Sequence, residues 1–176
     1  IVVDKLVEEN VIGFFQGRME FGPRALGSRS ILFHTKDKSV NDWLNTRLKR
    51  TEFMPFAPVT TEKLASSCFE EWNKFDLCSP FMTSTFKCKN NFINENPAVV
   101  HIDGTARPQV IKSSFNKIYY KVVNEYCRIT GEKSLINTSF NQHEEPIVCT
   151  PEDAIRSLLL NNVDCLAVGN YLVIKK

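Results

Sequence analysis

The spacing of apolar residues along the chain predicts a domain that mixes helices and strands. The clearest helix covers residues 117–130, where apolar side chains recur every three or four positions and Gly131 follows where helices commonly end. Residues 150–153 form a strong helix start, because a capping Thr precedes a Pro and two acidic residues. Other helices are predicted over 2–7, 39–48 and 62–71.

Short apolar runs predict the strands, and Gly169-Asn170 between the last two runs is typical of a β-hairpin. Residues 53–59 contain two prolines and are expected to be irregular or an edge strand, because proline cannot donate a ladder hydrogen bond. The predicted strands cover 11–15, 31–33, 81–86, 99–102, 108–111, 134–137, 165–168 and 171–174. The pattern therefore predicts an α/β or α+β fold, a single domain with a twisted mixed sheet and flanking helices.

Composition and charge narrow the function classes. The 176 residues are 43% hydrophobic, enough for one sizeable core, and 22 basic against 20 acidic residues argue against a polybasic nucleic-acid surface. No uncharged apolar run approaches the roughly 18 residues of a membrane span. The six cysteines lie at least ten residues apart, which does not suit a zinc finger and favours reduced thiols in the cytoplasm. No metal site is predicted in this chain.

The densest chemical signal is the segment 17–30, which follows a predicted strand. Its glycines allow a backbone to approach a ligand closely, and its arginines suit phosphate or carboxylate. An anion-binding loop is one interpretation, and Pro23 could open a short helix in it. The other interpretation is a tight turn with solvated arginines and Glu20 as an ion-pair partner. The residues concerned are Gly17, Arg18, Gly22, Arg24, Gly27 and Arg29.

Three further clusters carry polar chemistry. Residues 47–52 are basic at the end of a predicted helix, where cations are also common for structural reasons. Residues 101–107 place a Gly turn and an Arg after a predicted strand, and residues 137–141 supply amides and hydroxyls that suit either ligand binding or a turn. With only three histidines, a nucleophile–base site is poorly supported. The chemistry that remains is positioning and charge neutralisation around an anion.

These segments together resemble a known family. The run Gly17-Arg18-Met19-Glu20-Phe21-Gly22-Pro23-Arg24-Ala25-Leu26-Gly27 resembles the signature of the carbamoyltransferases that include nodulation and antibiotic O-carbamoyltransferases. Matching motifs follow in the family's order over nearly the whole chain. They are Pro55-Phe56-Ala57-Pro58, His101-Ile102-Asp103-Gly104-Thr105-Ala106-Arg107, Asn137-Thr138-Ser139-Phe140-Asn141 and Glu145-Pro146-Ile147.

The resemblance implies that residues 1–176 are the C-terminal, YrdC-like domain of such an enzyme. The chain opens on Ile1, as expected for a piece of a longer protein whose N-terminal metal-binding domain of actin-like fold would hold the iron. The C-terminal domain would bind carbamoyl phosphate and ATP, with Mg²⁺, and make carbamoyladenylate with release of pyrophosphate. The other domain would pass the carbamoyl group to a hydroxyl of the acceptor. A homodimer is also compatible with the resemblance.

Residue roles follow from the motif positions. Arg24 and Arg107 would bind the anionic ends of carbamoyl phosphate and ATP, and Lys49 or Arg50 would neutralise phosphate charge. Arg18 joins the binding set, although with Glu20 it is also expected to form an internal ion pair that shapes the loop. The carbamoyl amide or the nucleotide would be oriented by Asn137, Ser139 and Asn141. The chain departs from the family at Met54, where many members carry an Arg before Pro-Phe-Ala-Pro.

Two other function classes remain open from the sequence. A degenerate domain that only stabilises its partner domain or a dimer would fit the loss of an Arg at Met54. An RNA-binding module is the second alternative, because YrdC-like domains include RNA binders. The near-neutral charge argues against that class, since phosphate-driven binding needs a basic surface.

Overall fold

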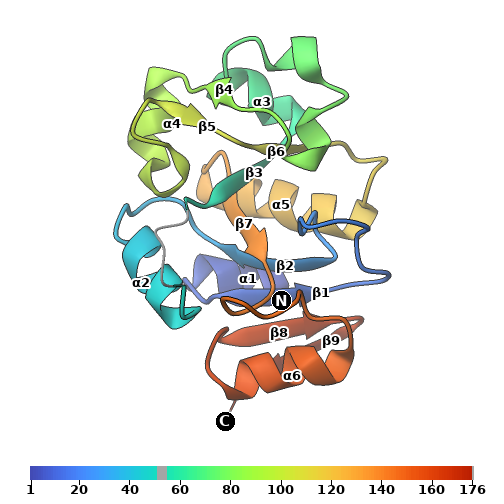
Figure 1. The fold of residues 1–176 in the computed structure, drawn as a ribbon. Coiled ribbons are helices and arrows are strands. Elements are labelled where there is room, and N and C mark those ends of the chain that lie inside the picture. Colours follow the sequence, from blue (N-terminus) through green and yellow to red (C-terminus); the bar gives the residue numbers. More distant parts are fainter. Residues whose placement is uncertain (51–54, 176) are drawn as a thin grey trace.

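A seven-stranded mixed sheet forms the centre of the molecule (Figure 1). The computed structural model describes residues 1–50 and 55–175. Two strand pairs are parallel, β1–β8 and β3–β6, and the other pairs are antiparallel. Across the sheet the strands follow the order β6 (Gln109–Ile111), β3 (Ala57–Thr61), β7 (Leu135–Ser139), β2 (Arg29–Phe33), β1 (Ile12–Phe15), β8 (Cys165–Val168) and β9 (Tyr171–Ile174).

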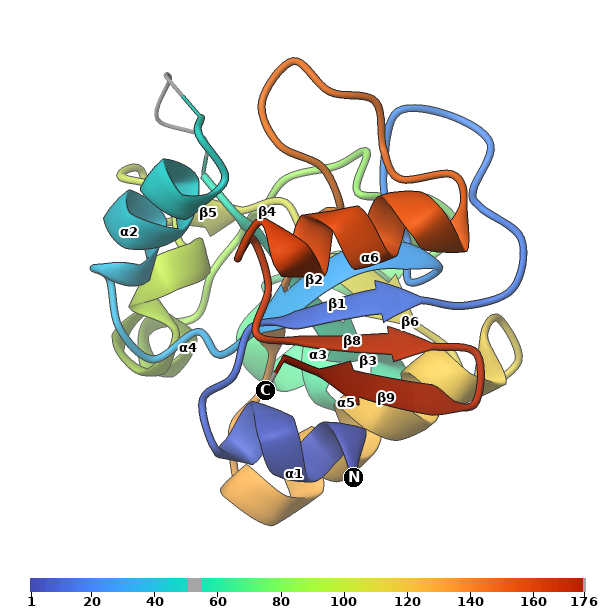
Figure 2. The same cartoon turned by 90° about the horizontal axis from the view of Figure 1, so that it is seen from below.

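Helices cover both faces of this sheet (Figure 2). Helix α6 (Pro151–Leu159) lies over β1 and β8, while α1 (Val2–Val7) and α5 (Lys117–Thr130) pack together on the opposite face. A hydrophobic core lies on each face of the sheet, and strand β2 contributes side chains to both. Ile31 and Phe33 belong to the core on the α6 side, and Leu32 belongs to the core on the α5 side. The expected single domain with a mixed sheet and flanking helices is thereby confirmed.

The two strongest helix predictions are also confirmed in detail. Asn116 caps α5 by accepting a hydrogen bond from the Tyr119 N–H, and Gly131 ends it with a φ of 78°. Thr150 and Asp153 form a reciprocal capping box at the start of α6. The predicted β8–β9 hairpin forms with Gly169 in its turn at a φ of 55°.

Smaller elements flank the β3 and β6 side of the sheet (Figure 1). They comprise α3 (Glu62–Cys68), α4 (Asn90–Glu95), the 3-10 helices η1 (Trp72–Phe75), η2 (Ser79–Phe81) and η3 (Pro97–Val99), and a two-stranded sheet of β4 (Phe86–Lys87) and β5 (Thr105–Ala106). Helix α2 (Val40–Arg47) lies lower in this view, at the level of β2.

Several local predictions were wrong. Residues 81–86 and 99–102 are not strands: η2, β4, η3 and a turn replace them, and α4 was not expected. Pro23 opens no helix, because bends run from Gly17 to Ser28. Strand β3 lies inside the sheet rather than at an edge. It tolerates Pro58 because β6 pairs with β3 only from Val59 onward, so no β6 ladder bond is required of Pro58.

The six cysteines are all free, and Cys68, Cys88, Cys127 and Cys165 are buried. Burial raises the pKa of the Cys68 thiol to about 11, so this thiol stays protonated at neutral pH. No helix within the described ranges is long and apolar enough to span a membrane.

We predict that Gly13→Ala destabilises the domain by about 1–3 kcal/mol through overpacking. A Cβ at Gly13 would lie 2.6 Å from Cζ of Phe140, whose ring is fully buried. Urea unfolding of Gly13→Ala, Phe140→Leu and the double variant measures this effect. Because the smaller side chain makes room for the methyl group, the double variant should lose less stability than the sum of the single losses. Additive losses would contradict the overpacking argument.

Candidate functional site

Five of the residues predicted to bind ligand line one cavity beside the carboxyl end of β7. The cavity has a volume of about 140 Å³ and collects residues from segments far apart in the chain. The predicted residues are Arg24, Arg50, Arg107, Asn137 and Ser139. The others are Pro23, Ala25, Pro55, Ala57, Met82 and Thr138.

Positive charge dominates this cavity. Three arginines line it, and none of the described lining residues is a carboxylate. Burial, and then the charge of Arg24, lower the pKa of Arg107, so these two guanidinium groups repel one another. Burial also lowers the pKa of Arg50. An anion in the cavity would relieve both the cost of burial and the repulsion.

Neutral groups hold Arg50 in place. Its Nη1 donates to Oγ1 of Thr138 at 3.1 Å, and its guanidinium carbon lies 5.5 Å from the centre of the Phe56 ring. A cation near an aromatic face gains electrostatic attraction without being neutralised. Arg50 therefore keeps its charge available to a ligand.

The loop of residues 16–28, which carries Arg24, is braced by charged groups that point into the protein. One carboxylate oxygen of Glu20 accepts the N–H groups of Leu26 at 2.7 Å and Ser28 at 2.6 Å. Arg29 donates to the carbonyls of Gln16 at 3.1 Å and Gly17 at 3.1 Å, and it lies 3.5 Å above the Phe15 ring. The Arg29 side chain is thus structural.

The expected ion pair between Arg18 and Glu20 is wrong. Glu20 does shape the loop, but through the two backbone N–H groups, which converge on a single carboxylate oxygen. Arg18 is exposed, and no salt bridge joins it to Glu20 in the part of the chain that the structure describes.

Asn137 lines the cavity from β7, and two hydrogen bonds fix the orientation of its side chain. Its Nδ2 donates to the carbonyl of Ala25 at 3.0 Å and to Oε1 of Gln109 at 2.8 Å. Its Oδ1 is buried and has no hydrogen-bond partner among the described residues. The amide nitrogen of Asn137 is therefore used to hold the loop at Ala25 and the side chain of Gln109, and its oxygen is left without a protein partner among the described residues.

The motif of residues 101–107 builds a turn that carries Arg107. Nδ1 of His101 lies 3.0 Å from Oγ1 of Thr105, and Asp103 accepts the Thr105 N–H at 3.0 Å and its hydroxyl at 2.7 Å. Gly104 adopts a φ of 78°, which favours glycine. These side chains satisfy one another, which leaves Arg107 as the motif residue that lines the cavity.

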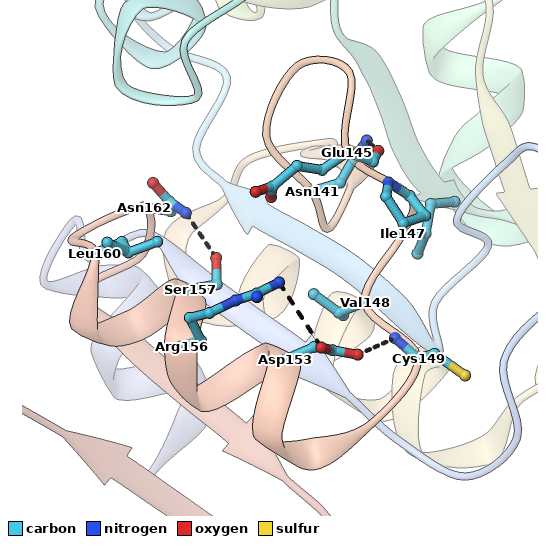
Figure 3. A pocket seen from close by; sticks show the side chains of 11 residues that line it. Asn141, Glu145, Ile147, Val148, Cys149, Asp153, Arg156, Ser157, Leu160 and Asn162 are labelled. Carbon is cyan, nitrogen blue, oxygen red and sulfur yellow. Dashed lines mark hydrogen bonds and ion pairs between the residues drawn. The ribbon is translucent and has the colours of Figure 1, made fainter.

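Three predicted site residues do not line this cavity. Arg18 and Lys49 are exposed, and Lys49 adopts a φ of 54° just beyond the end of α2. This left-handed residue reverses the chain, so Arg50 rather than Lys49 reaches the cavity. Asn141 lines a second, smaller cavity of about 120 Å³ against α6 (Figure 3). Its Nδ2 donates to the carbonyl of Glu145 at 2.7 Å, which is turn chemistry.

Met82 also lines the cavity, and no motif marks it in the sequence. It follows η2, is almost fully buried and has a φ of 52°. The departure at Met54 lies outside the described residues. In the described ranges, no group of three or more His, Cys, Asp or Glu side chains is placed to hold a metal ion.

The known proteins that this chain resembles in sequence are longer than the chain itself. An uncharacterised protein of Methanocaldococcus jannaschii, MJ1058, is 41% identical over 177 residues that cover 100% of this chain and 28% of that protein. The nodulation protein NolNO of Sinorhizobium fredii is 41% identical over 170 residues, which cover 94% of this chain and 24% of that protein. This chain thus spans only about a quarter of the length of these relatives.

A solved structure shares the fold. The crystal structure of full-length HypF in the phosphate- and nucleotide-bound form matches with a TM-score of 0.66 and 19% identity, over 96% of this chain and 24% of that one. This likeness confirms the expected YrdC-like fold. The family model described as "Carbamoyltransferase C-terminus" matches residues 3–175, which include all the arginines around the cavity. The motifs, the fold and this match agree, and the chain belongs to the carbamoyltransferase C-terminus family.

Proposed function

We propose that this domain binds carbamoyl phosphate and ATP and forms carbamoyladenylate with release of pyrophosphate. The observation that carries the proposal is the set of three arginines around one cavity whose described lining includes no carboxylate. Two polyanionic substrates must approach one another for this reaction, and partly buried guanidinium groups reduce their repulsion. Family membership and the phosphate- and nucleotide-bound state named for HypF support the same chemistry.

The proposed reaction balances with water as co-reactant. Water takes the phosphoryl group of carbamoyl phosphate, which leaves carbamate and phosphate. A carbamate oxygen then attacks the α-phosphorus of ATP, the bond from this phosphorus to the bridging oxygen of the β-phosphate breaks, and pyrophosphate leaves. Neither step needs a protein nucleophile, because alignment and charge stabilisation supply the catalysis. Mg²⁺ would arrive on the ATP phosphates, since the cavity offers arginines rather than carboxylates to a ligand.

We assign the roles by position in the cavity. Arg24 and Arg107 bind the anionic ends of the two substrates, and Arg50 takes the phosphate-neutralising role expected of Lys49 or Arg50. The Ser139 hydroxyl orients the carbamoyl group or the nucleotide, and Asn137 lines the same wall. We leave Arg18, Lys49 and Asn141 out of this set because they do not line the cavity.

We further propose that the chain acts as the C-terminal domain of a longer carbamoyltransferase. Its relatives are three to four times as long as the matched region, as the coverage of 28% and 24% shows. The transfer of the carbamoyl group to a hydroxyl acceptor, and the iron site implied by the resemblance, would belong to an N-terminal domain of that protein.

We predict that Arg24→Ala lowers carbamoyl phosphate-dependent release of pyrophosphate from Mg-ATP at least roughly tenfold. The expected loss corresponds to one charged hydrogen bond, about 1.5–3 kcal/mol. Arg128→Ala is the matched control, because Arg128 is an exposed arginine paired with Glu125 on α5. Pyrophosphate release and ATP binding are measured in the 176-residue chain.

The possible results separate the function classes. Release that depends on carbamoyl phosphate and collapses only in Arg24→Ala supports the proposal. ATP binding without release would mean that another part of the full-length protein completes the site. Failure to bind either substrate would contradict the proposal and favour a domain that only stabilises its partner, while tight RNA binding at physiological salt would favour the RNA-binding class.

A second prediction compares two neighbouring cations. Arg50→Ala should lower kcat/KM for carbamoyl phosphate at least roughly tenfold, whereas Lys49→Ala should change it less than roughly twofold. The reason is that the Arg50 side chain lines the cavity and the Lys49 side chain is exposed. Steady-state kinetics with both variants test this assignment, and an equal loss in the two would refute it.

A further inference from the structure

We infer that Gln109 is a positioning residue for the cavity, because its buried side chain holds both the loop that carries Arg24 and the amide of Asn137. The catalytic consequence of this inference rests on the proposed function, whereas the positioning itself does not. Gln109 lies on β6 and is fully buried, so its side chain meets no ligand directly. It therefore acts through its neighbours.

Three side-chain amides hold three consecutive carbonyls directly after Arg24. Asn137 from β7 donates to the carbonyl of Ala25 at 3.0 Å, and Gln109 from β6 donates to that of Leu26 at 2.8 Å. Asn116, which caps α5, donates to the carbonyl of Gly27 at 3.5 Å. Three separate elements thus fix the backbone that immediately follows Arg24.

Gln109 is the centre of this arrangement because both the nitrogen and the oxygen of its carboxamide have defined partners. Its Nε2 donates to the carbonyl of Leu26, while its Oε1 accepts from Nδ2 of Asn137 at 2.8 Å and from the hydroxyl of Tyr119 at 3.2 Å. Burial raises the pKa of Tyr119 well above its ordinary value, so the hydroxyl stays a donor. These contacts allow only one orientation of the Gln109 amide.

The loop has little freedom on its other sides. A Cβ at Gly27 would overlap the Tyr119 ring, so the loop backbone lies directly against α5. The N–H of Gly27 donates to the Ser30 hydroxyl at 3.0 Å, and Glu20 holds the neighbouring N–H groups. The backbone after Arg24 is therefore fixed through both its donors and its acceptors, and Gln109 contacts both this backbone, at the Leu26 carbonyl, and the side chain of Asn137 in the cavity wall.

The variant Gln109→Glu tests this inference with little change in shape. At a pH at which the new carboxyl is ionised, an oxygen replaces the donor to the Leu26 carbonyl and an acceptor remains for Asn137 and Tyr119. The measurements are therefore repeated at rising pH, because a protonated carboxyl would keep an O–H donor. The matched control is Asn96→Asp, because Asn96 is equally buried, donates to the Phe92 carbonyl at 3.4 Å and accepts from Thr35 at 2.7 Å. Asn96 also accepts from Ser134, which directly precedes the first residue of β7, whereas the cavity lies at the other end of that strand.

Hydrogen exchange followed by mass spectrometry reports the positioning without reference to activity. In Gln109→Glu, the amides of residues 26–28 should exchange roughly five- to tenfold faster, as expected for the loss of one buried hydrogen bond. The sheet amides should keep their protection in both variants. Unchanged exchange of residues 26–28 in Gln109→Glu, or an equal increase in Asn96→Asp, overturns the inference.

Kinetics then show whether the positioning acts through Arg24. Gln109→Glu should raise KM for carbamoyl phosphate roughly five- to tenfold in the wild-type background and have less than a twofold effect in the Arg24→Ala background. A full effect in both backgrounds would refute action through Arg24. If the wild-type chain releases no pyrophosphate, these kinetics cannot be run, and the exchange result alone decides whether Gln109 positions the loop. The proposed function itself fails if the wild-type chain also binds neither substrate.

Discussion

The constraint on which the site depends is the cost of keeping three guanidinium groups partly buried beside one small cavity. Burial disfavours the charges of Arg50 and Arg107, and Arg24 and Arg107 also repel one another. A carboxylate in the cavity would remove this cost, but it would also occupy the anion site. The fold instead surrounds the arginines with neutral groups, such as the Thr138 hydroxyl and the Phe56 ring beside Arg50. The residual cost is what a bound anion would offset.

The one carboxylate in the Arg24 loop shows how this separation is achieved. Glu20 accepts hydrogen bonds from the N–H groups of Leu26 and Ser28, and Arg29 donates hydrogen bonds to backbone carbonyls. The loop is therefore held by two charged side chains that do not line the cavity and by the amides of Gln109 and Asn137 from the sheet. This division depends on topology, because β6 and β7 lie on either side of β3 and bring Gln109 and Asn137 within 2.8 Å of one another.

Sequence reasoning found the parts whose signals are local. The periodicity of residues 117–130 gave α5 its bounds, and the long first motif identified Arg24 within the cavity. It failed where the outcome depends on contacts between distant segments. The choice of Arg50 over Lys49 depends on a left-handed residue at the end of α2, and the interior place of β3 depends on where β6 begins to pair. Met82 and Gln109 carry no motif of their own that links them to Arg24.

The contacts that hold the Arg24 loop account for the length of the first motif. A single arginine would bind an anion from a flexible loop, but it would lose conformational entropy at each binding event. In this chain the conformational entropy of the loop is lost on folding rather than on binding, because Glu20, Gly27 and Arg29 fix the backbone before any ligand arrives. The glycine at 27 is required by close contact with Tyr119, and the glutamate by two backbone donors. The motif thus holds the backbone around one charged side chain, Arg24, in a fixed conformation. Each residue that makes a holding contact must be of a defined type, and this requirement makes the motif specific as a signature.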